Sequence, residues 1–353
     1  MNNSSTSNSD FSRFIQRMIF YIGVLIVATA IVFALPLSRS YYFEIPRNSD
    51  YSKLSWVNDT LSKVNRLDDS YVFIGSSICM NGVNDSLLNA MDTTTSQYIN
   101  LGVTHTCYAI CDALIRYMVH DKQLHPKKVF LCFKGDAMAR NIHNMYPLAA
   151  TRSDILRSGL DGNTLILPTY LKRVAWNTHA LSSVFKFDDS DPKLAFHSDY
   201  GFKPQIPIPT EQVEKSYTRL RGGSEMNFKA IEAEANGTAM GMKTKLLLLK
   251  SDILENIRFQ RYEFEKSARM LEEAGIPFDI ILYPNLVSAR MGKPHLMADY
   301  IERTFTSIDF NKHHVIAVDD TCFTNAAYYV DMNHLNPSGA EKLTEFLYRT
   351  IHE

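Results

Sequence analysis

The sequence predicts an α/β fold, a three-layer sandwich with a parallel five-stranded sheet, a long insertion and an N-terminal transmembrane helix. Three observations support this prediction. Short apolar runs alternate with segments of helical spacing, which is typical of a parallel sheet covered by helices. The 353 residues are 45% hydrophobic and 21% charged, as in a globular protein with a sizeable core. A long uncharged stretch lies close to the N-terminus.

The uncharged stretch runs between Arg17 and Arg39, and its apolar part from Met18 to Leu35 reads MIFYIGVLIVATAIVFAL. About 20 such residues cross a hydrocarbon layer of about 30 Å. The stretch is long for the apolar part of a signal peptide, and no clean A-x-A cleavage site follows it. We therefore expect a transmembrane anchor over residues 18–37, with a cleaved signal peptide and a buried core helix as the alternatives.

The charges on either side of this anchor predict its orientation. Arg13 and Arg17 precede it, whereas the arginines that follow are mixed with acidic residues. The positive-inside rule then favours residues 1–17 as a polar cytoplasmic tail. Residues 41–353 are expected outside the cytoplasm as one domain.

The charge balance and the motif content exclude several classes of function. The 37 basic and 38 acidic residues give a formal net charge of −1, so we expect no nucleic-acid partner. The chain has neither a P-loop nor a dinucleotide-binding fingerprint, and no cofactor is expected. Five scattered cysteines form no disulfide framework, although one bridge between an unspecified pair stays open. Cys107 and Cys111 have helical spacing but no further ligands for a metal, and they are expected in the core.

After the anchor, apolar runs alternate with helical segments. The runs at 71–75, 97–102, 127–133, 276–284 and 313–320 are expected strands, because each is short, apolar and bounded by turn residues or charges. The segments at 83–91, 108–119 and 243–274 and the C-terminal segment from Pro337 have helical spacing. The order predicts a parallel sheet with helices on both faces.

Residues 141–242 do not follow this alternation. They hold many prolines and polar runs, and unstructured segments this long within an α/β domain are usually functional. We expect an insertion over the active site, with a second small domain as the alternative. Trp176 and Tyr200 within it are candidate substrate contacts, and local core packing is the competing interpretation.

Four polar segments follow the ends of predicted strands, among them KGD at 134–136 after the third strand. Ligands of open parallel sheets bind beyond the carboxyl ends of the strands. Ser76 and Ser77 come directly after the first strand, Gly102 follows the second, and Asp331 and His334 precede the last helix. The topology is expected to bring these segments to one rim of the sheet.

The segments GSS, Gly102 and DMNHLNPSGAEKL, in this order, resemble the SGNH or GDSL-like hydrolase superfamily. Its members place a serine after strand one, a glycine after strand two, often an asparagine after strand three, and a D-x-x-H pair before the final helix. The resemblance covers residues 70–136 and 276–351 and implies a flavodoxin-like sheet. It assigns the nucleophile to Ser77, and Ser76 stands where the family has aspartate.

The chemistry of these residue types agrees with that assignment. A serine hydroxyl is a poor nucleophile until a base takes its proton, and His334 is the candidate base. Asp331 is the candidate partner of the imidazole Nδ1 proton. The backbone amides of Ser77 and Gly102 are the candidate oxyanion hole.

The chain departs from the superfamily pattern after the third strand, where it reads FKGDAMARN without an asparagine in the matching turn. Asp136 is nearest that position, but an ionised carboxylate donates no hydrogen bond and repels an oxyanion. We expect it to cap a turn or to pair with Arg140. The third oxyanion donor is therefore unassigned.

This departure, the anchor and the GSS form are similar to membrane-anchored SGNH-like proteins of bacterial cell envelopes. The resemblance implies an O-acyltransferase or a carbohydrate esterase, acting on an exported polysaccharide through an acyl-Ser77 intermediate. It implies a periplasmic domain on an inner-membrane anchor, a glycan acceptor or substrate, and a multi-spanning membrane acyltransferase as a partner that supplies the acyl group. A non-catalytic SGNH-like protein that binds glycan or acts as a scaffold is the alternative.

Overall fold

A computed structural model describes most of the domain and the N-terminal helix. The described residues are 8–35, 52–104, 106–133, 146–160, 167, 169–171, 173–175, 177–178, 208–219, 229, 251–292, 294–318 and 321–353. The expected sites Asp136, Arg140, Trp176 and Tyr200 lie outside them, as does most of the expected insertion.

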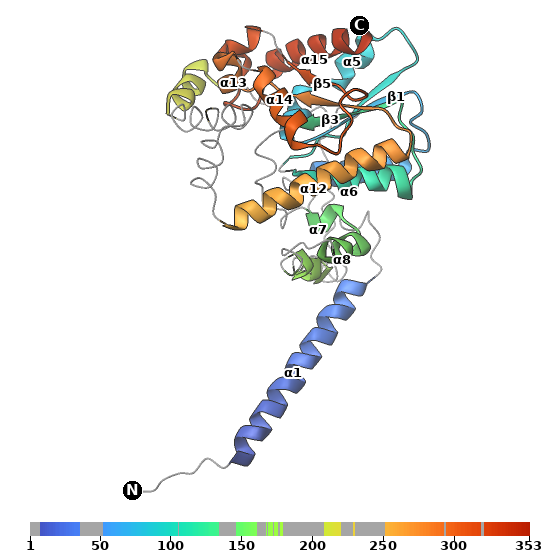
Figure 1. The fold of residues 1–353 in the computed structure, drawn as a ribbon, viewed down its shortest axis with the longest axis vertical. Coiled ribbons are helices and arrows are strands. Elements are labelled where there is room, and N and C mark those ends of the chain that lie inside the picture. Colours follow the sequence, from blue (N-terminus) through green and yellow to red (C-terminus); the bar gives the residue numbers. More distant parts are fainter. Residues whose placement is uncertain are drawn as a thin grey trace, which may run out of the picture.

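The predicted parallel five-stranded sheet is confirmed, in the order β2-β1-β3-β4-β5 (Figure 1). This is the flavodoxin-like order, in which sites lie beside the strand where the direction of winding reverses. The strands are β1 (Ser70–Ile74), β2 (Gln97–Asn100), β3 (Lys128–Phe133), β4 (Phe278–Leu282) and β5 (Val315–Ala317). Every residue of β1 and β4 is buried, which explains their largely apolar sequence. The buried Asp279 of β4 is paired with Lys128 of β3.

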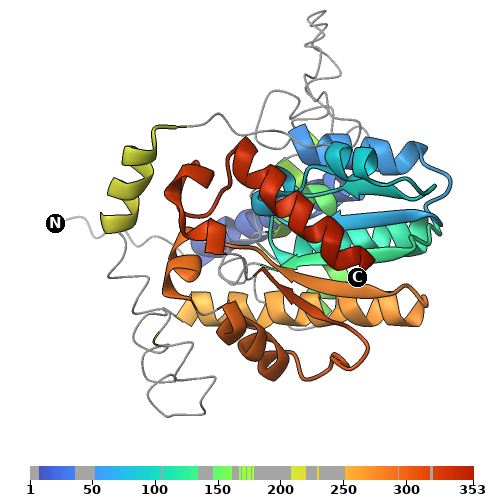
Figure 2. The same ribbon diagram turned by 90° about the horizontal axis from the view of Figure 1, so that it is seen from above.

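Helices cover both faces of this sheet (Figures 1 and 2). One face carries α6 (Tyr108–Arg116), α12 (Ser251–Glu273) and α14 (Pro294–Thr304), and the other carries α4 (Ser77–Gly82), α5 (Asp85–Met91) and α15 (Pro337–His352). Alternate residues of β1 serve the two faces: Val72 and Ile74 belong to the core under α6 and α12, and Phe73 to the core under α15.

Several short elements were not expected from the sequence. They are α3 (Ser52–Lys63), the π-helix η1 (Tyr117–Asp121), α7 (Tyr146–Ala149), α8 (Arg152–Leu160), α13 (Leu286–Met291), η3 (Thr321–Thr324) and η4 (Ala326–Tyr328). Most of them are too short to show a helical period. Local hydrogen bonds define α13 instead, because the Asn285 and Ser288 side chains form a capping box and Gly292 ends the helix with a φ of 61°.

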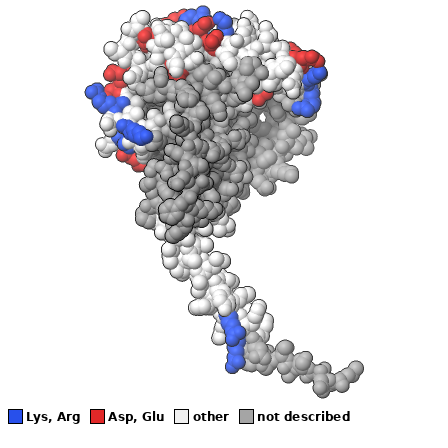
Figure 3. Space-filling model, turned by 180° about the vertical axis from the view of Figure 1, so that it is seen from behind, with Lys and Arg blue, Asp and Glu red and all other residues white. Residues whose placement is uncertain are grey.

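The first helix, α1 (Asn8–Ala34), projects away from the body of the protein (Figure 1). Its segment Phe11–Ala34 is long and apolar enough to cross a membrane, with a mean hydropathy of 2.2 in its apolar window and only 6% of that window buried. Basic side chains lie near its far end (Figure 3), where the sequence has Arg13 and Arg17. Length and exposure both agree with a single-pass anchor.

Gly75 joins β1 to α4 at a point where no side chain fits. A Cβ atom at this position would lie 2.5 Å from Cβ of Cys132 and 2.9 Å from Cβ of Cys79. Both cysteines are buried and free, and both sit on packed elements. The glycine therefore allows α4 to begin directly against β3.

We expect Gly75→Ala to lower the free energy of unfolding by about 1–3 kcal/mol, because the added methyl group overpacks this junction. Urea unfolding of the detergent-solubilised full chain, followed by tryptophan fluorescence, measures the change. Ser86→Ala, at an exposed position of α5, is the control and should change stability by less than about 0.5 kcal/mol. Equal stability of the two variants would contradict the packing argument.

Candidate active site

The structure brings Ser77, His334 and Asp331 together at the carboxyl-terminal rim of the sheet. The Ser77 Oγ lies 2.8 Å from Nε2 of His334. The other ring nitrogen, Nδ1, lies 2.8 and 3.0 Å from the two carboxylate oxygens of Asp331. An ionised carboxylate only accepts hydrogen bonds, so Nδ1 carries the proton and Nε2 is free to accept from the serine hydroxyl.

Each member of this trio has a different exposure. Ser77 is buried at 9% exposure, the His334 side chain is 21% exposed, and the Asp331 side chain is 52% exposed. Partial burial opposes ionisation of Asp331, but hydrogen bonds from the His334 ring and from the backbone N–H groups of Asn333 and His334 outweigh it. Together they hold the pKa of Asp331 below its usual range. The carboxylate is therefore ionised at neutral pH and able to stabilise an imidazolium.

The two serines after β1 have different positions. Ser76 is the N-cap residue of α4, in an extended conformation, and its backbone carbonyl accepts from Met80 N. Ser77 is the first residue of the helix, so its side chain leaves the sheet towards the last helix. Its backbone N–H is among the first in α4, which have no partner inside the helix.

A closed loop presents Asp331 and His334. The backbone N–H of Val330 donates to the carbonyl of His334 over 2.9 Å, and Tyr329 bridges to Leu335 as a short antiparallel pair. Asn336 then caps α15 by accepting from Gly339 N at 3.0 Å. These contacts fix the histidine just before α15, where the sequence motif predicted it.

Asn100 at the end of β2 connects the second strand to α4. Its side chain is fully buried and donates to the carbonyls of Cys79 at 2.9 Å and Val83 at 2.7 Å. Its Oδ1 accepts the backbone N–H of Gly102 at 2.9 Å. The last turn of α4 is thus attached to β2, and the first turn carries Ser77.

Gly102 lies against α4, as a Cβ atom there would come within 2.5 Å of Met80 N. Its absent side chain allows β2 and α4 to approach closely. Its N–H is already paired with Asn100, so an oxyanion would compete with that side chain for the donor. The packing role of Gly102 is visible in the structure, and its oxyanion role stays a prediction.

A buried pair of charges lies below α4. Lys53 on α3 is 1% exposed and Asp85 on α5 is fully buried. Burial lowers the pKa of Lys53 to about 7, although the nearby Asp85 carboxylate opposes the shift. Burial likewise raises the pKa of Asp85 to about 6, against a hydrogen bond from Asn100 N and the charge of Lys53.

Part of the expected insertion, the helix at 210–219, is attached beside the loop that carries Asp331 and His334. Glu214 on this helix forms a two-pronged ion pair with Arg290 of α13, at 2.8 and 2.5 Å, and the same guanidinium lies 4.4 Å from the Tyr217 ring. Arg290 also donates to the carbonyl of Thr324. Leu286 N, on the same helix α13, donates to the carbonyl of Met332, between Asp331 and His334. The insertion therefore returns to the rim where the trio lies.

The five cysteines lie outside the trio of Ser77, His334 and Asp331. None of them forms a disulfide, and burial raises the pKa of Cys107 to about 11 and that of Cys111 well above its usual value. Among the described residues, no group of three or more histidines, cysteines or acidic residues could hold a metal ion. Cys107 and Cys111 are core residues of α6 and its N-cap.

We expect Asn100→Asp to destabilise the protein by about 1–3 kcal/mol, because the carboxylate cannot donate to the carbonyls of Cys79 and Val83. Labelling of Ser77 by a serine-directed phosphonate should also slow, since α4 loses its attachment to β2. Asn89→Asp is the matched amide-to-acid control: it also loses hydrogen bonds, to the carbonyls of Asp85 and Tyr98, but it leaves α4 attached to β2, so labelling should stay near the wild-type rate. A wild-type labelling rate in a destabilised Asn100→Asp protein would show that the reactivity of Ser77 does not depend on this attachment.

No protein-family model matches this chain, and no curated protein matches it significantly. Its kinship with the SGNH superfamily therefore stays a resemblance, carried by the segments around Ser77, Gly102 and His334.

Proposed function

We propose that this chain is a membrane-anchored, serine-dependent enzyme that adds O-acyl groups to, or removes them from, an exported cell-envelope polysaccharide. The observation that carries the proposal is the hydrogen-bonded line from Ser77 Oγ through His334 to Asp331. The acetyl group is the proposed acyl group, and the resemblance to envelope SGNH-like proteins supports the glycan.

The geometry suits a two-step acyl transfer. Ser77 Oγ attacks the ester carbonyl while its proton passes to His334 Nε2, and Asp331 stabilises the imidazolium that forms. The tetrahedral intermediate collapses by breaking the bond to the leaving alcohol, which takes the proton from His334. A water molecule or a sugar hydroxyl then gives its proton to His334 and attacks the carbonyl carbon of the acyl-serine. The bond from this carbon to Ser77 Oγ breaks, and Oγ takes the proton back from His334. Water as the acceptor makes the chain an esterase, and a sugar makes it a transferase.

The apolar helix α1 supports the proposed location. We propose an inner-membrane anchor with Arg13 and Arg17 on the cytoplasmic side and the domain in the periplasm, where an exported glycan would be within reach. A multi-spanning acyltransferase that carries acyl groups across the membrane is the proposed partner. Trp176 and Tyr200 remain candidate contacts for the sugar.

A glycan-binding protein without catalytic activity is the second candidate. One observation favours it: the Gly102 N–H, a proposed oxyanion donor, is engaged by Asn100. Loss of an oxyanion donor costs about 3 kcal/mol of transition-state stabilisation, which alone reduces the rate by about two orders of magnitude.

Four variants separate the two candidates. We expect Ser77→Ala and His334→Ala to abolish both ester hydrolysis and phosphonate labelling, because the two residues act as one unit. Asp331→Asn should reduce labelling less than His334→Ala does, since it disturbs the tautomer and leaves the base in place. Ser76→Ala is the matched control and should keep most of the activity. A folded Ser77→Ala protein with wild-type activity would favour the glycan-binding alternative.

The full chain in detergent, supplied with a chromogenic acetyl ester and an oligosaccharide, distinguishes the acceptors. Acetylated sugar identifies a transferase, and free acetate alone identifies an esterase. Mass spectrometry of the oligosaccharide and an acetate assay on the same sample give the two readouts. If the folded wild-type protein forms neither acetylated sugar nor free acetate, an acyl-transfer enzyme of this specificity is contradicted.

The orientation of α1 has its own test. We expect a reporter fused after Glu353 to be active only if it is a protein that works outside the cytoplasm. The reason is that Arg13 and Arg17 should keep the N-terminus on the cytoplasmic side. Alkaline phosphatase and green fluorescent protein fusions form the matched pair. Fluorescence without phosphatase activity would place the domain in the cytoplasm, away from any exported glycan.

A further inference from the structure

The end of α1 is covered by a group of helices that we call the membrane-side unit: α7, α8 and the described residues of 167–178. Two side chains of this unit cap the last turn of α1. Arg152 donates to the carbonyl of Ala34, and Asn177 Nδ2 donates to that of Val32 at 2.8 Å. The ring of Tyr170 packs on Phe33 with centroids 4.7 Å apart. The last carbonyls of a helix lack partners within it, and a cation there also complements the helix dipole.

The length of α1 places this contact at the edge of a bilayer. Arg17 is the last charged residue before the apolar part of the helix. From Arg17 to Ala34 the helix rises about 26 Å, somewhat less than the roughly 30 Å of a hydrocarbon core. If α1 spans the membrane with Arg17 at one boundary, then Ala34 lies at the other boundary or slightly inside it. Side chains that pack on Ala34 must then lie against lipid.

The membrane-side unit has the surface that such a position requires. Outside α1, the described residues include four exposed large hydrophobic side chains, and three of them belong to this unit: Leu156, Leu167 and Leu171, at 52%, 62% and 51% exposure. Arg152 and Arg157 are exposed on the same α8 as Leu156. Exposed leucines beside arginines are typical of helices that lie in a membrane interface.

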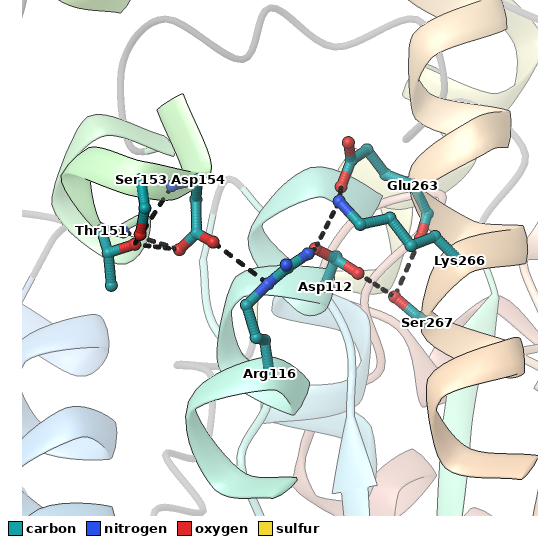
Figure 4. A network of polar contacts seen from close by, with 8 residues as sticks. All are labelled: Asp112, Arg116, Thr151, Ser153, Asp154, Glu263, Lys266 and Ser267. Carbon is teal, nitrogen blue, oxygen red and sulfur yellow. Dashed lines mark hydrogen bonds and ion pairs between the residues drawn. The ribbon is translucent and has the colours of Figure 1, made fainter. Parts of the chain in front are cut away.

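Buried ion pairs attach this unit firmly to the domain (Figure 4). Asp154 of α8 lies 3.2 Å from Arg116 of α6, and Arg116 also donates to Asp112 at 2.6 Å. Lys266 and Ser267 of α12 contact Asp112 from the other side. Breaking a buried ion pair leaves an uncompensated buried charge, so α8 is expected to move with α6 and α12.

We infer that the membrane-side unit is a second membrane contact, which lies in the lipid interface through Leu156, Leu167 and Leu171. The inference rests on α1 spanning a membrane and is independent of the catalytic trio. The occupant of this surface is the lipid bilayer itself, because the unit that carries these three exposed leucines contacts the last turn of the exposed, apolar α1. The layers then stack outward from the membrane as the membrane-side unit, the α6/α12 layer, the sheet and α15 (Figure 1).

Photo-crosslinking of the full chain in phospholipid nanodiscs tests the inference. Benzoylphenylalanine replaces Leu156, Leu167 or Leu171 in three separate proteins, and lipid adducts on the corresponding peptide are measured by mass spectrometry. We expect adducts at least about tenfold more abundant than at Glu341, an exposed position of α15 on the far side of the sheet. Leu25 within α1 is the positive control.

The outcomes are distinct. Adducts at Leu25 with none above the Glu341 level at Leu156, Leu167 and Leu171 overturn the inference and leave the anchor in place. If Leu25 gives no adducts either, both the inference and the transmembrane anchor are overturned, because α1 is then outside the bilayer. Neither result depends on acyl transfer, so the proposed function is tested separately.

Discussion

One buried amide, that of Asn100, holds α4, the helix that begins with Ser77, in place. It replaces apolar contact at the end of β2 with hydrogen bonds to Cys79, Val83 and Gly102. A helix as short as α4 has little stability of its own, so its position depends on contacts with its neighbours. Without the amide, two buried carbonyls and one N–H would lose their partner, and the orientation of Ser77 would be less defined.

Charged groups in the interior extend the same constraint to other layers. Lys53 of α3 and Asp85 of α5 are both buried and oppose each other's pKa shift, and Arg116 of α6 pairs with Asp154 of α8. Such pairs add little net stability relative to apolar packing, but removing one partner is costly. Their main effect is therefore on the relative position of the helices. Helices held by apolar contact alone could slide along each other, whereas a buried charge pair favours one position.

The strands and the trio were predictable because their signals are local or ordered along the chain. Each strand is a short, largely apolar run, and Ser77, Asp331 and His334 follow strand ends in the order of the superfamily they resemble. Asn100 carried a weaker signal, an amide at the end of a largely apolar run, and its partner Cys79 lies about 20 residues away. Arg290 and Arg152 gave none, because a salt bridge to Glu214 or a contact with Ala34 depends on packing between distant segments. Short helices such as α13 depend on caps that read as ordinary turns.

The bond between Ser77 and His334 joins residues 257 positions apart in the chain. During synthesis Ser77 therefore emerges long before the histidine with which it pairs. A chain that stops short of residue 334 has the serine without this partner. If the domain is exported as proposed, the trio can assemble only after residue 334 has crossed the membrane.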